Sequence, residues 1–122
     1  AMSLWPVTVG PNATLILGNK RIQVEGAMVE PLLQREGQHL TAGLRPEHWH
    51  LAPATNRNLQ AEVSHCERLG NEQILTCRLL DGDQLIQVRG STEINITAGD
   101  AIHLDPDPTG WRLFDADGEA IR

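Results

Sequence analysis

A pair of histidines separated by a single residue is the first candidate for chemistry in this sequence. His48 and His50 would place two imidazoles on one face of an expected strand, a spacing compatible with zinc or copper. A metal site needs more ligands than this pair. The remaining histidines, His39, His65 and His103, lie far away in the sequence and would have to converge through the fold. The sequence therefore predicts no metal site.

Other short motifs also lack the partners that their chemistry requires. Cys66 follows His65, but neighbours on a strand point to opposite faces, which prevents the hydrogen bond that would activate a thiolate. Residues 115–119 are similar to the start of a calcium loop, yet no bidentate glutamate follows at the required distance, so we expect a turn. The sequence contains no phosphate loop, nucleophile elbow or dinucleotide motif. Catalysis by this chain alone is not expected.

The composition points to one globular domain. The chain has 122 residues, of which 40% are hydrophobic and 21% charged, and its formal net charge is −6. Negative charge and a 3% aromatic content disfavour single-stranded nucleic acid, which is bound by stacking within a basic groove. We expect the three tryptophans to be core or interface anchors. No stretch approaches the roughly 20 apolar residues of a membrane span, and no signal peptide is expected.

The sequence pattern is typical of an all-β protein. Glycine and proline separate short runs rich in Val, Ile, Leu and Thr. Gly18-Asn19 between two such runs predicts a hairpin over 14–24, and residues 70–72 predict a second one between 60–68 and 73–80. Residues 27–36 form either one helical turn or a loop, because Pro31 disfavours a helix interior. The other expected strands are 4–9, 40–44, 49–52, 84–89, 101–104, 111–114 and 120–121, with a turn at 81–83 before the strand at 84–89.

Residues 53–58 contain no large apolar side chain and are expected to connect two halves of the chain. We expect residues 1–52 to form one strand set and residues 58–122 a second one, packed together as one compact module. If the second hairpin is centred near residue 71, Cys66 and Cys77 lie almost opposite each other, which makes a disulfide geometrically conceivable. A reduced, apolar pair in the cytosol is the ordinary expectation.

Four motifs occur in a distinctive order. They are Gly43-Leu-Arg45-Pro46-Glu47-His48, then Glu67-Arg-Leu69-Gly70-Asn-Glu72, then Gly99-Asp100, and finally Asp105-Pro106 followed by Leu113-Phe114-Asp115. This order resembles the C-terminal region of ATP-binding subunits of ABC sugar importers of the MalK and UgpC type. Residues 1–6 are also similar to the Ala-Met-Asn-Leu-Leu junction that follows the nucleotide-binding domain in that family, with Ser3 in place of Asn and Trp5 in place of Leu.

The resemblance implies a fold and a role. The fold would be a small OB-like/TOBE barrel of short antiparallel strands in two halves: an OB-like set over 1–52, a connection at 53–58 and a TOBE-type set over 58–122. The role would be a non-catalytic regulatory or dimerisation domain of an importer for carbohydrate or glycerol-phosphate-type solutes. ATP and magnesium would belong to a preceding nucleotide-binding domain, and this part would hold no cofactor.

The resemblance also implies partners and a location. The partners would be the chain's own nucleotide-binding domain, a second copy of the subunit, the membrane subunits of the transporter and a regulatory protein, with no nucleic acid among them. The location would be cytoplasmic, peripheral to the inner membrane through the transporter complex. The motif residues that are candidates for regulatory or dimer contacts are Arg45, Pro46, Glu47, His48, Glu67, Gly70, Phe114 and Asp115.

Each motif residue also has a structural explanation. Pro46 fixes φ and makes the chain turn after Arg45, and Glu47 can pair with Arg45 or with a cation on a neighbouring strand. His48 can change its charge near neutral pH. Glycine at 70 supplies a positive φ in the second hairpin. Leu113 and Phe114 are expected to fill the barrel, and Asp115 is expected to accept hydrogen bonds in a turn.

One alternative belongs to a different functional class. Related TOBE segments of molybdate systems bind oxyanions, and this chain could bind an oxyanion or another small solute if enough donors converged. Arg45, Arg68, Arg78 and backbone amides are the candidate donors.

Overall fold

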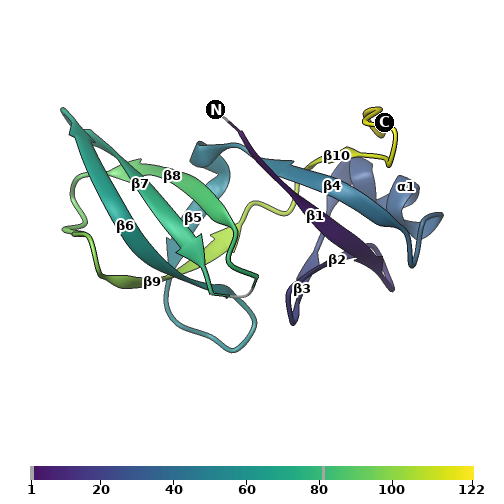
Figure 1. Cartoon of the computed structure of the whole chain (residues 1–122), viewed down its shortest axis with the longest axis horizontal. Helices are drawn as coiled ribbons and strands as arrows, with labels where there is room; N and C mark the ends of the chain where they lie inside the picture. Colours follow the sequence, from purple (N-terminus) through teal and green to yellow (C-terminus); the bar gives the residue numbers. More distant parts are fainter. Residues whose placement is uncertain (1, 81) are drawn as a thin grey trace.

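The structure is a computed structural model and describes residues 2–80 and 82–122. It consists of two five-stranded antiparallel sheets that form two lobes side by side (Figure 1). Short helical segments accompany the strands, and none in the described part of the chain is long and apolar enough to cross a membrane. The predicted fold class, all-β with short antiparallel strands in two halves, is confirmed.

The first sheet has the strand order β10-β4-β1-β2-β3. Its strands are β1 (Ser3–Gly10), β2 (Thr14–Leu17), β3 (Lys20–Gln23), β4 (His39–Leu44) and β10 (Arg112–Phe114). The predicted first hairpin is confirmed, because β2 pairs with β3 across Gly18-Asn19 and Gly18 has a φ of +61°. Apolar residues alternate along β1 and β2, which places every second side chain in the core.

A short helical segment lies between β3 and β4. The 3₁₀ helix η1 (Gly26–Met28) leads into α1 (Val29–Leu33), which resolves the two possibilities for this region in favour of one helical turn. Pro31 is tolerated because it lies in the first turn of α1, where its missing N–H has no intrahelical partner. Leu32 is fully buried and anchors the helix, and Gly37, with a φ of +87°, turns the chain into β4.

The second sheet has the strand order β5-β9-β6-β7-β8. Its strands are β5 (Trp49–Ala52), β6 (Leu59–Leu69), β7 (Glu72–Leu79), β8 (Leu85–Ser91) and β9 (Ala101–Pro106). The outermost strands β5 and β8 approach each other, so the sheet curves towards a barrel. The turn before β8 has a positive φ at both Gly82 and Asp83; Asp81, which was also expected in this turn, lies outside the described residues.

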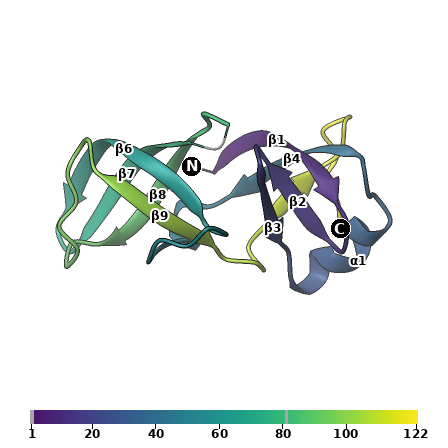
Figure 2. The same ribbon diagram turned by 90° about the horizontal axis from the view of Figure 1, so that it is seen from below.

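The sequence predicts that the strands before residues 53–58 form one set and the strands after them a second set. This prediction is wrong for two strands. β5, before the connection, pairs with β9 of the second sheet, and β10, near the end of the chain, pairs with β4 of the first sheet. The chain therefore crosses between the sheets twice. It crosses first through the 3₁₀ helix η2 (Pro46–His48) and again through residues 107–111 (Figures 1 and 2). These crossings meet at the junction of the two lobes.

The predicted placement of the two cysteines opposite each other is also wrong. The second hairpin turns at Gly70-Asn71, and a register shift occurs between Val63 and His65. Cys66 therefore faces Leu75, while Cys77 faces Val63. Both cysteines are free thiols, and burial raises the pKa of the Cys77 thiol to about 12.

Candidate functional site

Three tryptophans form a cluster where the two lobes meet. Trp5 comes from β1, Trp49 from β5, and Trp111 from the crossing just before β10. Trp5 stacks on Trp49 with ring centroids 5.9 Å apart, and Trp111 meets both rings edge-on at 6.0 and 6.2 Å. Each side chain is at most 3% exposed. The cluster joins the cores of the two sheets. Stacked and edge-to-face contacts between aromatic rings are favourable, so the cluster stabilises this junction.

The predicted motif at residues 45–48 forms the first crossing. Arg45 is exposed and extended, and its carbonyl accepts a hydrogen bond of 2.9 Å from the His48 backbone N–H. Pro46 begins the 3₁₀ turn, as its fixed φ favours. The His48 carbonyl accepts a hydrogen bond of 2.8 Å from the Asp107 N–H. The two crossings are thus tied together by the backbone.

Glu47 is exposed on this crossing. A hydrogen bond from its own backbone N–H is the main cause that lowers the pKa of its carboxyl group, and the charges of His48, Arg45 and Arg89 act in the same direction. The expected pairing of Glu47 with Arg45 does not reach ion-pair distance: within residues 2–80 and 82–122, the ion pairs involve Arg78 and Arg89 with other carboxylates. The Glu47 carboxylate therefore faces solvent.

His48 lies half-buried beside the second crossing. Its Nδ1 atom is buried and has no hydrogen-bond partner. A Cβ atom placed on Gly110 would lie 2.8 Å from that Nδ1, so only glycine leaves room for the imidazole. His50 is exposed on β5. The structure, over the ranges it describes, contains no group of three or more His, Cys, Asp or Glu side chains arranged to hold a metal.

The other motif residues lie in two separate places. Glu67 and Gly70 are at the tip of the β6–β7 hairpin, where Gly70 has a φ of +69° as predicted. Phe114 and Asp115 lie at the end of β10 in the other lobe (Figure 1). Asp115 accepts hydrogen bonds of 2.9 Å from the backbone N–H groups of residues 117 and 119, which confirms it as a turn acceptor. The eight motif residues do not form one site.

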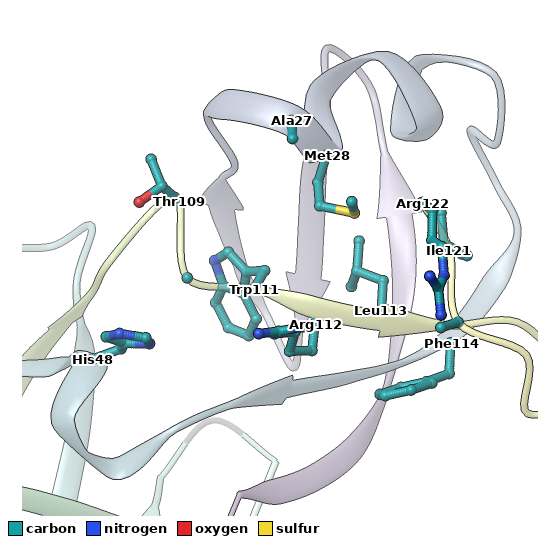
Figure 3. Close-up of a pocket in the computed structure, with 12 residues that line it drawn as sticks. Ala27, Met28, His48, Thr109, Trp111, Arg112, Leu113, Phe114, Ile121 and Arg122 are labelled. Atoms are coloured by element: carbon teal, nitrogen blue, oxygen red, sulfur yellow. The ribbon is translucent and has the colours of Figure 1, made fainter.

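A groove of about 600 Å³ runs beside the second crossing in the first lobe (Figure 3). Its lining comes from residues just before α1, from His48, and from the two ends of the C-terminal segment. The lining residues are Ala27, Met28, His48, Thr109, Gly110, Trp111, Arg112, Leu113, Phe114, Ala120, Ile121 and Arg122. Sequence analysis identified His48 and Phe114 but did not predict the groove, because the C-terminal part of its lining is more than 60 residues away from the rest in the sequence.

Comparison with known proteins identifies the family. The profile of the TOBE domain matches residues 42–114, which is more than half of the chain. The chain belongs to the TOBE domain family. The match begins in β4 and ends in β10, so it includes both crossings and the whole second sheet.

This TOBE domain is similar to part of several importer subunits. It is 31% identical over 112 residues to an sn-glycerol-3-phosphate import ATP-binding protein from Psychromonas ingrahamii, covering 87% of this chain and 28% of that protein. It is 28% identical over 101 residues to a maltose/maltodextrin import ATP-binding protein from Vibrio cholerae, covering 83% of this chain and 26% of that protein. The chain thus spans little more than a quarter of the length of these relatives.

A solved structure shares the fold. The cytoplasmic molybdate-binding protein ModG superposes with a TM-score of 0.71 over 90% of this TOBE domain and 93% of that chain, at 16% identity. This similarity establishes the architecture alone. The three arginines proposed as oxyanion donors are placed separately: Arg68 donates to the Asn95 side chain at 2.9 Å, and Arg78 pairs with Asp83 at 2.6 Å. Arg45 is exposed on the first crossing.

Asp107, in the second crossing of the TOBE domain, is expected to titrate below an ordinary aspartate. Its Oδ1 accepts hydrogen bonds from the Thr109 backbone N–H at 2.9 Å and from the Thr109 hydroxyl at 2.8 Å. These bonds are the main cause that lowers the pKa of Asp107, and the charges of His48 and His50 lower it further. The stabilisation is present above the unfolded pKa of about 3.9 and is lost as the pH falls through the folded value.

Titration of the carboxyl ¹³C signals by NMR would measure this pKa. In Thr109→Val, which removes the hydroxyl and keeps the backbone N–H, we expect the Asp107 midpoint to move part of the way back towards the ordinary value. Thr55→Val, which removes a hydroxyl from the 53–58 connection, is a matched control and should leave the Asp107 midpoint unchanged. An ordinary Asp107 midpoint in the parent protein would contradict the prediction.

Proposed function

We propose that this TOBE domain is the non-catalytic regulatory or dimerisation part of the ATP-binding subunit of an ABC importer for carbohydrate or glycerol-phosphate-type solutes. The observation that carries the proposal is the extent of the similarity. Importer ATP-binding proteins match 83–87% of this chain, while the chain accounts for only 26–28% of their length. The remaining length of such a subunit would hold ATP, magnesium and the catalytic residues, and this domain would hold no cofactor.

The physical character of the domain supports a role in protein contacts. The tryptophan cluster and the hydrogen bond between the two crossings hold the lobes together. Several large apolar side chains are exposed on the surface: Leu4, Leu33, Leu69, Leu80, Leu85 and Ile94. The partners would be the nucleotide-binding domain of the same subunit, a second copy of the subunit, the membrane subunits and a regulatory protein. Such a domain would lie on the cytoplasmic side, held at the membrane by the transporter.

The motif residues fall into two groups on the molecule. Residues 45–48 and Phe114-Asp115 lie at the junction and on the first lobe, while Glu67 and Gly70 lie at the tip of the β6–β7 hairpin. Arg89 links residues 45–48 to the hairpin, because its charge acts on the Glu47 carboxylate and its Nε lies 3.9 Å from the Glu72 carboxylate beside the hairpin tip. These two regions are therefore close enough for one partner to contact both.

The first test uses the 122-residue chain alone. Calorimetric titration with ATP and magnesium should give no binding heat, and a phosphate-release assay should give the rate of the buffer blank. Titration with molybdate, sulfate and phosphate in the same buffer should also give no heat, because the candidate arginines do not converge. ATP turnover by the purified chain would contradict the proposal, and saturable molybdate binding would favour the oxyanion alternative.

The second test uses the complete protein that contains this segment. Deleting the segment should leave basal ATP hydrolysis by the nucleotide-binding part and change the regulation of solute uptake or the dimerisation of the subunit. A complete protein with no ATP-binding part would contradict the proposal. A deletion that leaves both regulation and dimerisation unchanged would contradict it as well.

A further inference from the structure

The groove beside the second crossing has the size of a ligand site. Its volume of about 600 Å³ lies within the range of roughly 300–1,000 Å³ that small-molecule sites occupy. Three separate segments build it: Ala27 and Met28 before α1, His48 on the first crossing, and the C-terminal residues on both sides of the 115–119 turn (Figure 3). A groove assembled from packed elements is largely formed before any ligand arrives.

The walls of the groove are apolar and partly aromatic. Trp111 and Leu113 are buried and lie on the same side of β10 as the Met28 thioether, while the half-buried Phe114 points to the other side of the strand (Figure 3). Aromatic rings bind flat apolar molecules by offset or edge-to-face contact, and a methionine side chain adapts to the remaining space. These walls favour a planar ring over an extended or heavily hydroxylated molecule.

The charge of the groove is opposite to that of the protein. The chain carries 16 acidic and 10 basic residues, yet the twelve lining residues include Arg112 and Arg122 and no Asp or Glu. A guanidinium group binds a carboxylate through two parallel hydrogen bonds. The groove is therefore suited to an anion, in a domain that otherwise repels anions.

Two buried ring nitrogens at the groove have no partner in the protein. The Nε1 atom of Trp111, on a side chain that is 3% exposed, and the Nδ1 atom of His48 are both buried without a hydrogen bond. Buried polar groups are nearly always satisfied. The Trp111 N–H can only donate and therefore calls for an acceptor from outside the chain, whereas the His48 Nδ1 donates or accepts according to its tautomer. The Trp5 and Trp49 nitrogens are also unpartnered, but neither residue lines the groove.

We propose that this groove binds a small aromatic carboxylate. The ring would pack against Leu113 and Met28 beside Trp111, and the carboxylate would accept hydrogen bonds from Arg112 and Arg122. This site is independent of the proposed role in an importer, because it needs only the residues of the chain described here. It requires no metal, no nucleotide and no second copy.

The test is a ¹H–¹⁵N NMR titration of the 122-residue chain with 1-naphthoate. The three tryptophan indole N–H signals are resolved from the backbone, and Trp111→Phe identifies that of Trp111. We expect the Trp111 signal to shift saturably. In the double variant Arg112→Gln/Arg122→Gln, the affinity should fall at least about tenfold, because both charge-assisted hydrogen bonds are lost.

Two controls distinguish specific binding in the groove from nonspecific binding. Arg21→Gln removes an exposed arginine on β3 that does not line the groove, and it should leave the affinity unchanged. The neutral analogue 1-naphthalenemethanol should bind at least about tenfold more weakly than the carboxylate. Equal affinity for the two compounds, equal weakening by Arg21→Gln, or no saturable shift would overturn the proposal. Should Trp111→Phe fail to fold, the single variants Arg112→Gln and Arg122→Gln supply the same comparison through the backbone signals of the groove.

Discussion

Replacement of Trp49 by alanine is expected to lower the free energy of unfolding by about 3–5 kcal/mol, the cost of truncating a large aromatic side chain in a packed core. Trp49 is 2% exposed and contacts Trp5 from the first sheet and Trp111 from the second crossing. Its removal leaves a cavity where the cores of the two lobes meet. Small domains have a total stability of about 5–15 kcal/mol, so the variant should be close to unfolding at room temperature.

Urea denaturation followed by circular dichroism measures this loss without relying on tryptophan fluorescence, which the substitution itself changes. Trp49→Phe keeps an aromatic ring at the junction and should lose less than the alanine variant. Leu85→Ala truncates a side chain that is 63% exposed on β8, and its effect should stay within about 0.5 kcal/mol. If Trp49→Ala cost no more than Leu85→Ala, the cluster would not join the two lobes.

The tryptophan cluster also shows what the sequence could and could not predict. Local patterns were sufficient for the hairpin over β2 and β3, because Gly18-Asn19 provides the positive φ of a tight turn between two apolar runs. The pairings of β5 and β10, unlike that hairpin, join segments that are far apart in the sequence. Each strand is only three or four residues long and pairs with a segment more than 50 residues away, and no local pattern encodes such a pairing.

The predicted placement of Cys66 opposite Cys77 was wrong for a related reason. The two-residue turn at Gly70-Asn71 sets Cys66 opposite Leu75, and the irregularity between Val63 and His65 then sets Cys77 opposite Val63. Nothing in the composition of β6 marks that position in advance. The groove was missed because its residues come together only when the C-terminal segment returns to the first sheet.

The motif at residues 45–48 was placed correctly, but its physical task became visible only in the structure. Pro46 was predicted to turn the chain, and it begins the 3₁₀ turn that carries the chain from the first sheet to the second. The hydrogen bond between His48 and Asp107 then fixes this crossing to the other one. The motif at residues 45–48 therefore lies at the junction of the two lobes. Its residues have a structural task there, so they need not bind a ligand.

Gln73 in β7 is a polar residue that no sequence motif marks. It is 1% exposed, and its Nε2 donates to the carbonyls of Ser91 and Ile94 at 2.9 and 2.8 Å, while the Cys66 thiol donates to its Oε1 at 3.3 Å. The glutamine fastens the segment that follows β8 to the inside of the second sheet. Ile96, which is 5% exposed, is held in the core by the same segment.

Gln73→Leu is expected to lower the free energy of unfolding by about 1–3 kcal/mol, since it leaves two carbonyl groups without their buried donor. The apolar side chain has a similar size, so the loss would reflect the hydrogen bonds more than a cavity. Amide hydrogen exchange should increase most over residues 91–96 and change little in the first sheet. Gln60→Leu, at an exposed glutamine on β6, is the matched control and should change neither quantity. Equal exchange over residues 91–96 in both variants would show that the glutamine amide does not hold this segment.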